Sequence, residues 1–439
     1  MSFSAFRLTS TALAITLAMS LLTTGVRAGD LNETEQKLVS AIHARTPQAL
    51  ALLEQSARIN SGTMNTEGVR AVGAVFRREL DDIGFSTRWV ELPADMQRAG
   101  HLLAEHKGDQ GKRVLLLGHL DTVFEKDSAV PLWQPHGDRV SGQGASDMKG
   151  GDVIILEALR ALKAVGALER AQIKVMFTGD EEKPGLPVAV TRAEMVAAAK
   201  ASDVALSFEG TVRRHGQDTA TVGRRASGGF VVEVKGRQGH SAGIFSADSG
   251  YGANYEAARI VNSFREQLME PDLTFNIGTI LGGTDVHYSE ADSGGEASGK
   301  TNVIAKEALI HGDLRYLSAE QRERARARMR EIVAASLPGT SASIRFHENY
   351  PPMTPTEGNL KLLAVYSKAS DDAGLGTISA LAPGERGAGD IQFVAPYVDS
   401  LDGLGASGDG AHSPREEMEI ASLERAAIRT AILLYRLTR

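Results

Sequence analysis

A ten-residue stretch, Leu115–Phe124 (LLLGHLDTVF), strongly constrains how this 439-residue chain can fold. Its leucines are typical of the buried end of a central strand, and His119 and Asp121 follow them. Residues two apart in a strand point to the same face, so both polar side chains emerge at one strand end. A neutral imidazole binds a metal through one ring nitrogen when an acceptor fixes the other. Alone, the pair is equally typical of a buried histidine beside a turn aspartate.

Four further segments place polar side chains after apolar runs or in glycine-rich loops. They are GQGASDMKGG with Asp147, FTGDEE with Glu181 and Glu182, LSFE with Glu209, and GDGAHSP with His412. Each alone has an ordinary explanation, such as a helix N-cap or an exposed turn. Open α/β sheets, however, bind ligands beyond the carboxyl ends of their strands. The five segments together therefore predict one site at a sheet edge.

The residue types in these segments suit a pair of divalent metal ions. Two histidines with several carboxylates favour Zn²⁺, because zinc accepts mixed nitrogen and oxygen ligands. The chain has no cysteine, which excludes thiolate ligands and thiol nucleophiles. A carboxylate that bridges two ions about 3.5–4 Å apart lets a shared water lose its proton near neutral pH. One of the paired glutamates is then free to act as a general base.

The length and the pattern of elements predict two structural units. A chain of 439 residues exceeds what one hydrophobic core usually holds. Apolar strands alternate with amphipathic helices such as Thr66–Ile83, which predicts an α/β sheet covered on both faces. Between residues 225 and 352, alternating strands predict a small α+β insert with one open sheet face. Within it, Gly283–Lys300 has the composition of a mobile loop.

The first 28 residues have the features of an export signal. Arg7 precedes an apolar, uncharged run, Thr11–Val26, and Val26-Arg27-Ala28 has the pattern that signal peptidase favours. We therefore expect a periplasmic or secreted chain beginning near Gly29, with no membrane attachment after cleavage. An uncleaved anchor is the alternative, although the run is short for a membrane span. The net charge of −7 and the lack of long Lys/Arg runs argue against a nucleic-acid partner.

The order of these motifs resembles the M20 family of metallopeptidases, and within it the glutamate carboxypeptidase branch. The shared pattern is His-x-Asp, Gly-x-Gly-x-x-Asp-x-Lys-Gly-Gly, Glu-Glu, Ser-Phe-Glu and a late histidine in a glycine loop. The resemblance implies a dizinc exopeptidase-type catalytic domain, a mixed sheet flanked by helices, over residues 29–224 and 353–439. It also implies an inserted lid and dimerisation domain at 225–352, and therefore a homodimer.

The resemblance further implies the reaction and the metal ligands. The expected activity is cleavage of an amide beside a C-terminal free carboxylate, on a small peptide or N-acyl amino acid. An N-acyl-amino-acid amidohydrolase or a dipeptidase of the same family is the alternative. Asp147 is expected to bridge the two zinc ions. The implied ligands are His119, Asp147 and Glu209 for one ion and Asp147, Glu182 and His412 for the other.

Further residues are expected to support the reaction. Asp121 is implied to orient His119, and Glu181 to be the general base that activates the bridging water. His240, in GRQGHSAG, matches a lid histidine that reaches the neighbouring subunit's site and polarises the scissile carbonyl. Arg315 in GDLRY matches the lid arginine for the substrate carboxylate, and Asn302 in TNVI the nearby amide. An arginine suits this role because its planar fork binds a carboxylate bidentately.

The chain also departs from the glutamate-specific pattern and contains two rival motifs. A second arginine is expected after the last lid strand, where this chain reads HENYP, so the preferred C-terminal residue is not fixed. Residues 239–243 (GHSAG) fit the serine-hydrolase elbow with Ser241 as nucleophile, but the helical pattern resumes only near Gly252. Residues 403–408 fit a dinucleotide fingerprint without a following helix. A non-catalytic binding protein would require a lost ligand or base, and none is missing.

Overall fold

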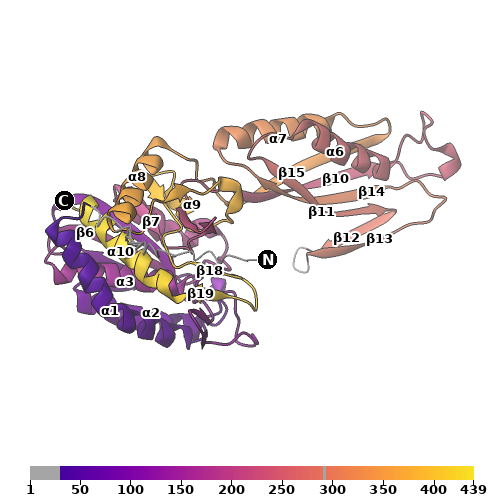
Figure 1. Ribbon diagram of the computed structural model, residues 1–439. Coiled ribbons are helices and arrows are strands. Elements are labelled where there is room, and N and C mark those ends of the chain that lie inside the picture. Colours follow the sequence, from indigo (N-terminus) through magenta and orange to yellow (C-terminus); the bar gives the residue numbers. More distant parts are fainter. Residues whose placement is uncertain (1–29, 290–292) are drawn as a thin grey trace, which may run out of the picture.

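The computed structural model describes residues 30–289 and 293–439 of the chain. The predicted signal peptide, residues 1–28, lies outside the described residues. Figure 1 shows two parts, a larger one that contains the beginning and the end of the described chain and a smaller one built from its middle. Among the described residues, no helix has the length and hydropathy to cross a membrane.

The larger part is organised around a six-stranded mixed sheet. In spatial order its strands are β1 (Ser86–Val90), β2 (His101–His106), β6 (Ala171–Thr178), β3 (Gln110–His119), β7 (Val204–Ser207) and β17 (Asp399–Leu401). The last four strands run parallel to one another, whereas β2 is antiparallel to both of its neighbours. The carboxyl ends of β6, β3 and β7 therefore meet at one edge of the sheet.

Helices bury both faces of this sheet, as the apolar run of β3 requires. Val114 and Leu116 join the core under α1, α3 and α10, whereas Leu115 and Leu117 pack toward α5 and α9 on the other face. Figure 1 shows α10, from the C-terminal end, lying beside α3 and α1. The helices are α1 (Glu33–Ala57), α2 (Thr66–Ile83), α3 (Lys149–Ala164), α4 (Val188–Thr191), α5 (Ala193–Lys200), α8 (Glu357–Asp372), α9 (Ile391–Val394) and α10 (Ile420–Leu437).

Local capping residues set several helix boundaries. Asn32 accepts a hydrogen bond from the Glu35 amide while the Glu35 side chain accepts from the Asn32 amide, which forms a capping box at α1. Asn65 caps the start of α2, and Gly84 ends it with φ of 112°, a backbone conformation that favours glycine. Thr356 caps α8 in the same way as Asn65. The bounds of α2 agree with the helix predicted over Thr66–Ile83.

The smaller part is an antiparallel four-stranded sheet with helices on one face, as expected for an α+β insert. Its order is β11 (Thr274–Gly283), β14 (Glu307–Arg315), β10 (Ser227–Gly236), β15 (Thr340–Tyr350), covered by α6 (Ala253–Gln267) and α7 (Ala319–Ala334). The chain enters and leaves this part side by side, because the Arg224 and Met353 backbones exchange hydrogen bonds of 2.9 and 3.0 Å. The α/β fold class is confirmed, whereas the domain boundaries at 224/225 and 352/353 stay a prediction.

The segment Gly283–Lys300 differs from its prediction as a mobile loop. Its described residues form a hairpin of β12 (Asp285–Ser289) and β13 (Gly294–Ser298). The Tyr288 ring stacks on His311 of β14, with ring centroids 3.8 Å apart. The prediction as a loop rested on the Gly- and Ser-rich composition of the segment. It was wrong because strand pairing and stacking against the lid stabilise the two strands.

Short elements complete the fold. One small sheet joins β18 (Gly408–Asp409), β19 (Glu417–Glu419), β5 (Arg139–Ser141) and β4 (Gln134–His136). Another joins β16 (Ser379–Ala380), β9 (Gln217–Ala220) and β8 (Arg213–Arg214). Single 3₁₀ turns occur at η1 (Ala94–Met96), η2 (Ser241–Gly243) and η3 (Pro383–Glu385). The first small sheet holds the loop that contains His412 beside the main sheet edge.

Candidate metal centre

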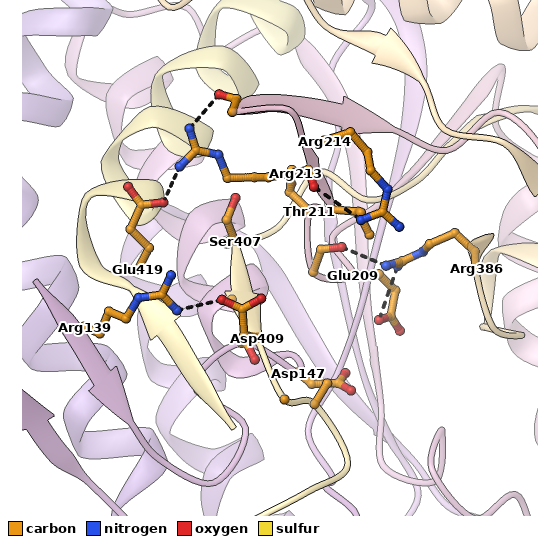
Figure 2. A pocket seen from close by; sticks show the side chains of 17 residues that line it. Arg139, Asp147, Glu209, Thr211, Arg213, Arg214, Arg386, Ser407, Asp409 and Glu419 are labelled. Atoms are coloured by element: carbon orange, nitrogen blue, oxygen red, sulfur yellow. Dashed lines mark hydrogen bonds and ion pairs between the residues drawn. The ribbon is translucent and has the colours of Figure 1, made fainter. Parts of the chain in front are cut away.

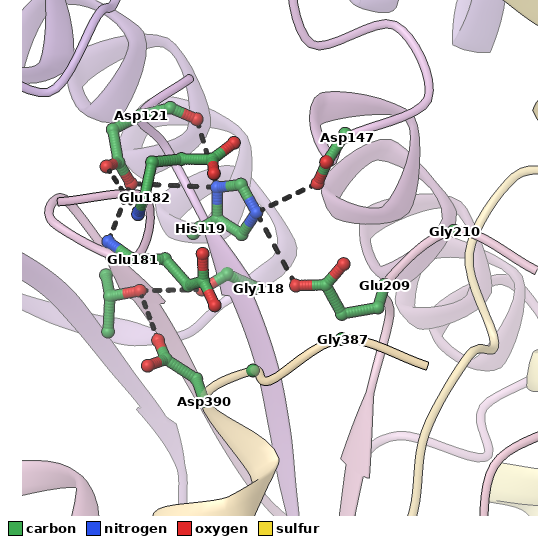
Figure 3. A network of polar contacts seen from close by, with 12 residues as sticks. Gly118, His119, Asp121, Asp147, Glu181, Glu182, Glu209, Gly210, Gly387 and Asp390 are labelled. Carbon is green, nitrogen blue, oxygen red and sulfur yellow. Dashed lines mark hydrogen bonds and ion pairs between the residues drawn. The ribbon is translucent and has the colours of Figure 1, made fainter. Parts of the chain in front are cut away.

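His119 is the last residue of β3 and is buried, with 1% of its surface exposed. Its Nδ1–H donates to the Asp121 backbone carbonyl at 3.0 Å, which turns Nε2 toward the sheet edge. Nε2 lies 3.3 Å from Asp147 Oδ1 and 3.6 Å from Glu209 Oε1, as Figure 3 shows. Three segments that are far apart in sequence therefore meet at one imidazole nitrogen.

A second group forms around His412. Its Nε2 lies 3.1 Å from Asp147 Oδ2 and 3.0 Å from Glu182 Oε2. The two oxygens of Asp147 thus face different histidines, which is the arrangement that a carboxylate bridging two metal ions requires. The His412 backbone has φ of 61°, so this residue sits in the left-handed region within its glycine-rich loop.

Asp121 contacts His119 through its backbone carbonyl rather than through its carboxylate. Its carboxylate oxygen lies 3.6 Å from His119 Nδ1, whereas its backbone carbonyl makes the hydrogen bond. The carboxylate instead accepts hydrogen bonds from the backbone amides of Glu181 and Glu182, at 3.0 and 3.1 Å. Thr63 donates a third hydrogen bond to it. Asp121 therefore fixes the turn that carries both glutamates as well as the orientation of His119.

The residues of the cluster are suited to bind cations, and without cations some of their buried polar atoms lack a hydrogen-bond partner. His119 Nε2 and Glu182 Oε1 are buried and have no hydrogen-bond partner. Donor atoms of His119, Asp147 and Glu182 lie within 4.8 Å of one another, as do those of His119, Glu181 and Glu209. Imidazole nitrogens with carboxylate oxygens are the donor set that zinc takes in proteins. By position alone, Glu181 could therefore also contribute a ligand beside His119 and Glu209.

The electrostatics of the cluster confirm a shortage of positive charge. Burial and the neighbouring Asp147 charge together raise the pKa of Glu182 to about 7. Burial and the Glu209 charge raise the pKa of Glu181 well above its ordinary value. The hydrogen bonds of His412 with Asp147 and Glu182 raise the pKa of that imidazole to about 11. In this cluster, bound protons compensate the negative charge that metal cations would otherwise neutralise.

Several supporting residues were not predicted from the sequence. Arg192 is fully buried and pairs through Nη1 with Asp180 at 2.5 Å and through Nε with Asp390 at 2.7 Å. Thr178, the last residue of β6, also donates to Asp390 at 2.6 Å. This network anchors the residue that precedes Glu181. Sequence inspection misses it because Asp390 lies about 200 residues away from its partners in the chain, and nothing local marks it.

The three predicted lid residues lie apart from this cluster. His240 and Asn302 are neighbours within the lid, since the Ser241 amide donates to the Asn302 carbonyl at 2.9 Å. Arg315 is in β14, and its Nε donates to Asp313 at 3.0 Å. In the described part of the chain, no hydrogen bond or ion pair joins these three side chains to the carboxylate cluster. Within one chain, the structure therefore does not bring them together with the metal ligands.

The rival with a serine nucleophile does not match the geometry. Ser241 begins a single 3₁₀ turn, and the next helix, α6, starts only at Ala253. A nucleophile elbow needs a sharp turn from a strand directly into a helix. The GHSAG motif is therefore a lid turn.

Comparisons with known proteins agree with the geometry. The model of peptidase family M20/M25/M40 matches residues 115–435. The chain is 27% identical to carboxypeptidase G2 from a Pseudomonas species over 435 residues, covering 95% of this chain and 97% of that protein. The structure resembles an aminopeptidase PepT from Bacillus cereus with a TM-score of 0.70, at 16% identity over 90% of this chain and 99% of that one.

A third similarity concerns the metal site. A protein from Bacillus subtilis, YXEP, described as a dinuclear metal-binding peptidase of the M20 family, matches with a TM-score of 0.61. It is 15% identical, and the match covers 90% of this chain and 99% of that one. The chain therefore belongs to peptidase family M20/M25/M40, and it is a metal-dependent hydrolase that acts on peptide or amide bonds.

Proposed function

We propose that this protein is an exported dizinc hydrolase that cleaves an amide bond beside a free carboxylate. The convergence of five potential ligands at the carboxyl ends of parallel strands, with both oxygens of Asp147 facing histidines, carries this proposal. The similarity to carboxypeptidase G2 over nearly the whole chain supports the carboxypeptidase class. An N-acyl-amino-acid amidohydrolase and a dipeptidase remain the alternatives within the family.

The chain supplies ligands for two zinc ions in this proposal. His119 and Glu209 would hold one ion, Glu182 and His412 the other, and Asp147 both. When bound, such ions lower the pKa of water and polarise a carbonyl. The Asp121 contacts described above hold His119 and the Glu181–Glu182 turn in fixed positions, so the ligand set is rigid before a substrate arrives.

Glu181 is the proposed general base. Its backbone is held on both sides, because its amide donates to Asp121 and its carbonyl accepts from the Tyr350 hydroxyl at 3.1 Å. In the described part of the chain, its carboxylate makes no hydrogen bond and is free to accept a proton from water. Because burial raises its pKa, it can also retain that proton and pass it to the leaving amine.

The lid supplies the proposed substrate contacts. Arg315 would bind the C-terminal carboxylate of the substrate, with Asn302 near it. His240 would act in the site of a second subunit, so the proposed active form is a homodimer. Residues 1–28 would direct the chain to the periplasm or outside the cell and be removed.

A hydrolysis panel on the zinc-loaded protein, with and without a chelator, tests the proposal. The panel contains N-acetyl-glutamate, N-acetyl-phenylalanine, N-acetyl-alanine, an unblocked dipeptide and a simple ester. Chelator-sensitive cleavage of an N-acyl amino acid is expected, with two zinc ions per chain by elemental analysis. Cleavage of the ester alone, indifferent to the chelator, would contradict the proposal.

A further inference from the structure

A pocket of about 550 Å³ lies directly beside Asp147 and Glu209, on the larger part of the molecule (Figure 2). Residues 210–214 and 407–411 form much of its wall, and Arg386 lies beside Glu209 and Gly210. None of the described lid residues lines it. Its volume is in the range of pockets that bind small molecules.

Four arginines line this pocket, and three of them are already paired with carboxylates. Arg139 lies 2.7 Å from Asp409. Arg213 lies 3.0 Å from Asp218 and 2.9 Å from Glu419. Arg214 lies 2.5 Å from Glu385. The positive charge of these three side chains is therefore compensated within the protein.

Arg386 is the exception among the four. Its side chain is only 13% exposed, and its Nη1 donates to the Gly210 carbonyl at 3.0 Å. Nη2 lies 3.9 Å from Glu209 Oε2, too far for a hydrogen bond, and the buried Nε has no partner. Glu209 is moreover one of the proposed metal ligands, so its charge is shared with a cation. A buried guanidinium with unmet donors is unfavourable unless an anion binds to it.

The loop that carries Arg386 is fixed in place. Arg224 donates to the backbone carbonyls of Gly387 and Ala388, at 3.0 and 2.7 Å, and forms a buried ion pair with Asp402. Arg224 itself is 2% exposed. Arg386 is therefore presented on a rigid backbone, which lowers the entropy lost when a ligand binds.

We propose that Arg386 binds a carboxylate on the acyl half of the substrate. This inference rests on the proposed function, in which the lid holds the C-terminal carboxylate of the leaving half. The pocket belongs to the larger part alone and opens beside Asp147 and Glu209, where the scissile carbonyl would lie, so it receives the other half. The substrate class is then an amide of a short dicarboxylic acid, such as a succinyl group, or a peptide with an acidic residue before the scissile bond.

The test compares substrates that differ in the position of a second carboxylate. N-succinyl-alanine, N-acetyl-alanine and N-acetyl-glutamate are hydrolysed by zinc-loaded wild-type protein and by Arg386→Gln. The substitution is expected to lower kcat/KM for N-succinyl-alanine about 10- to 100-fold more than for the two acetyl substrates, the range of a charge-assisted hydrogen bond. Arg386→Lys should restore part of the preference, because it keeps the charge and loses the fork.

Arg214→Gln is the matched control. Arg214 lines the same pocket, but its charge is already compensated by Glu385, so its removal should leave the preference among the three substrates unchanged. Zinc content is measured on every variant. An equal fall on all three substrates, or a loss of zinc, would show that Arg386 positions Glu209 instead and would overturn the proposal. A fall in kcat/KM confined to N-acetyl-glutamate would show that Arg386 binds a carboxylate on the leaving half of the substrate, and it would overturn the proposal as well.

Binding of succinate, measured by calorimetry on the zinc-loaded protein, separates this inference from the proposed function. If the wild-type protein hydrolyses none of the amides, the proposed function fails. Succinate binding that weakens about 10-fold in Arg386→Gln but not in Arg214→Gln would still support the carboxylate site. Equal binding of succinate to both variants would contradict a carboxylate site at Arg386.

Discussion

Asp147 is the residue on which the two halves of the metal centre depend. Burial alone would raise its pKa, but the adjacent His119 and His412 imidazoles outweigh that effect and hold it well below its usual range. Burial and neighbouring charges instead raise the pKa values of Glu181 and Glu209. The centre therefore combines one strongly ionised carboxylate with others whose pKa values are raised.

Replacement of the proposed base should separate catalysis from metal binding. Glu181→Gln keeps the size of the side chain but removes its ability to accept a proton. We expect kcat to fall about 10²- to 10⁴-fold while both zinc ions stay bound, as measured by steady-state kinetics and elemental analysis. Glu169→Gln, at an exposed position, is the control. A near-normal kcat would remove Glu181 from the role of base.

Metal uptake should release protons, and the sign follows from the pKa shifts. The pKa of His412 is raised to about 11 and that of Glu182 to about 7, so both hold protons near neutral pH in the metal-free protein. Metal ligation requires the deprotonated forms, so the apparent zinc affinity should rise with pH between 6 and 8, about tenfold per pH unit for each proton released. Calorimetry in buffers of different ionisation enthalpy measures the number of protons, and a value of zero would contradict this assignment.

The sequence was informative about single residues only where their motifs are local. The five ligands could be predicted because each follows a strand or lies in a glycine loop. The Asp121 carboxylate was assigned to His119, since the backbone carbonyl that actually contacts His119 leaves no trace in the residue pattern. No sequence motif marked Arg386 as a binding residue. Its proposed role depends on which of the other arginines in the pocket form ion pairs with carboxylates, and only the three-dimensional structure shows this.

Among the secondary-structure elements, the parallel strands β6, β3 and β7 do most to place the site. Their ends carry Glu181, His119 and Glu209 to one edge, and the helices on both faces hold that edge still. The turn after β6 carries the most charge, and the buried Arg192 anchors it to Asp180 and Asp390.

Removal of this anchor should destabilise the fold and the turn together. Arg192→Leu leaves two buried carboxylates without a cation, and breaking a buried pair in this way costs about 3–5 kcal/mol. We expect a loss of that size in the free energy of unfolding by chemical denaturation, and a lower kcat in the fraction that stays folded. Arg170→Leu, which breaks an exposed pair with Asp109, is the control, and its free energy of unfolding should change far less. Similar losses in both variants would contradict the argument.

Element prediction succeeded where one chain segment carries its own signal. Thr66–Ile83 has helical periodicity, a cap at Asn65 and a stop at Gly84, and the helix has those bounds. The hairpin β12–β13 was missed because its stability comes from Tyr288 stacking on His311, which lies on a different strand. Long-range contacts of this kind are invisible to local patterns.

At the scale of the whole molecule, the lid and the metal centre are linked at the crossing between the two parts. Tyr350, the last residue of β15, donates to the Glu181 carbonyl and packs on Phe393. The lid residues His240 and Arg315 have no described contact with the carboxylates of the metal centre in the same chain. The proposed reaction therefore requires a second subunit or a movement of the lid.

Mixed dimers distinguish these two requirements. His240→Ala alone and Glu181→Gln alone should both be nearly inactive. After the two inactive variants are mixed and re-associated, a dimer that combines one intact base with one intact lid histidine should regain activity, because His240 acts in the partner's site. Analytical ultracentrifugation establishes that dimers form. Recovery of no activity in proven mixed dimers would assign His240 to its own chain or to no catalytic role.

The chain order of the site has a consequence for how the protein matures. The ligand set runs from His119 to His412, and α10, which follows it, packs against α3 and α1. The lid lies entirely between these ends, so its residues are synthesised before the second histidine exists. A growing chain therefore has no complete place for metal until its last segment has emerged. For an exported chain, as proposed, that folds only after translocation, the ions would come from the compartment of arrival, and the supply of zinc there would set the yield of active protein.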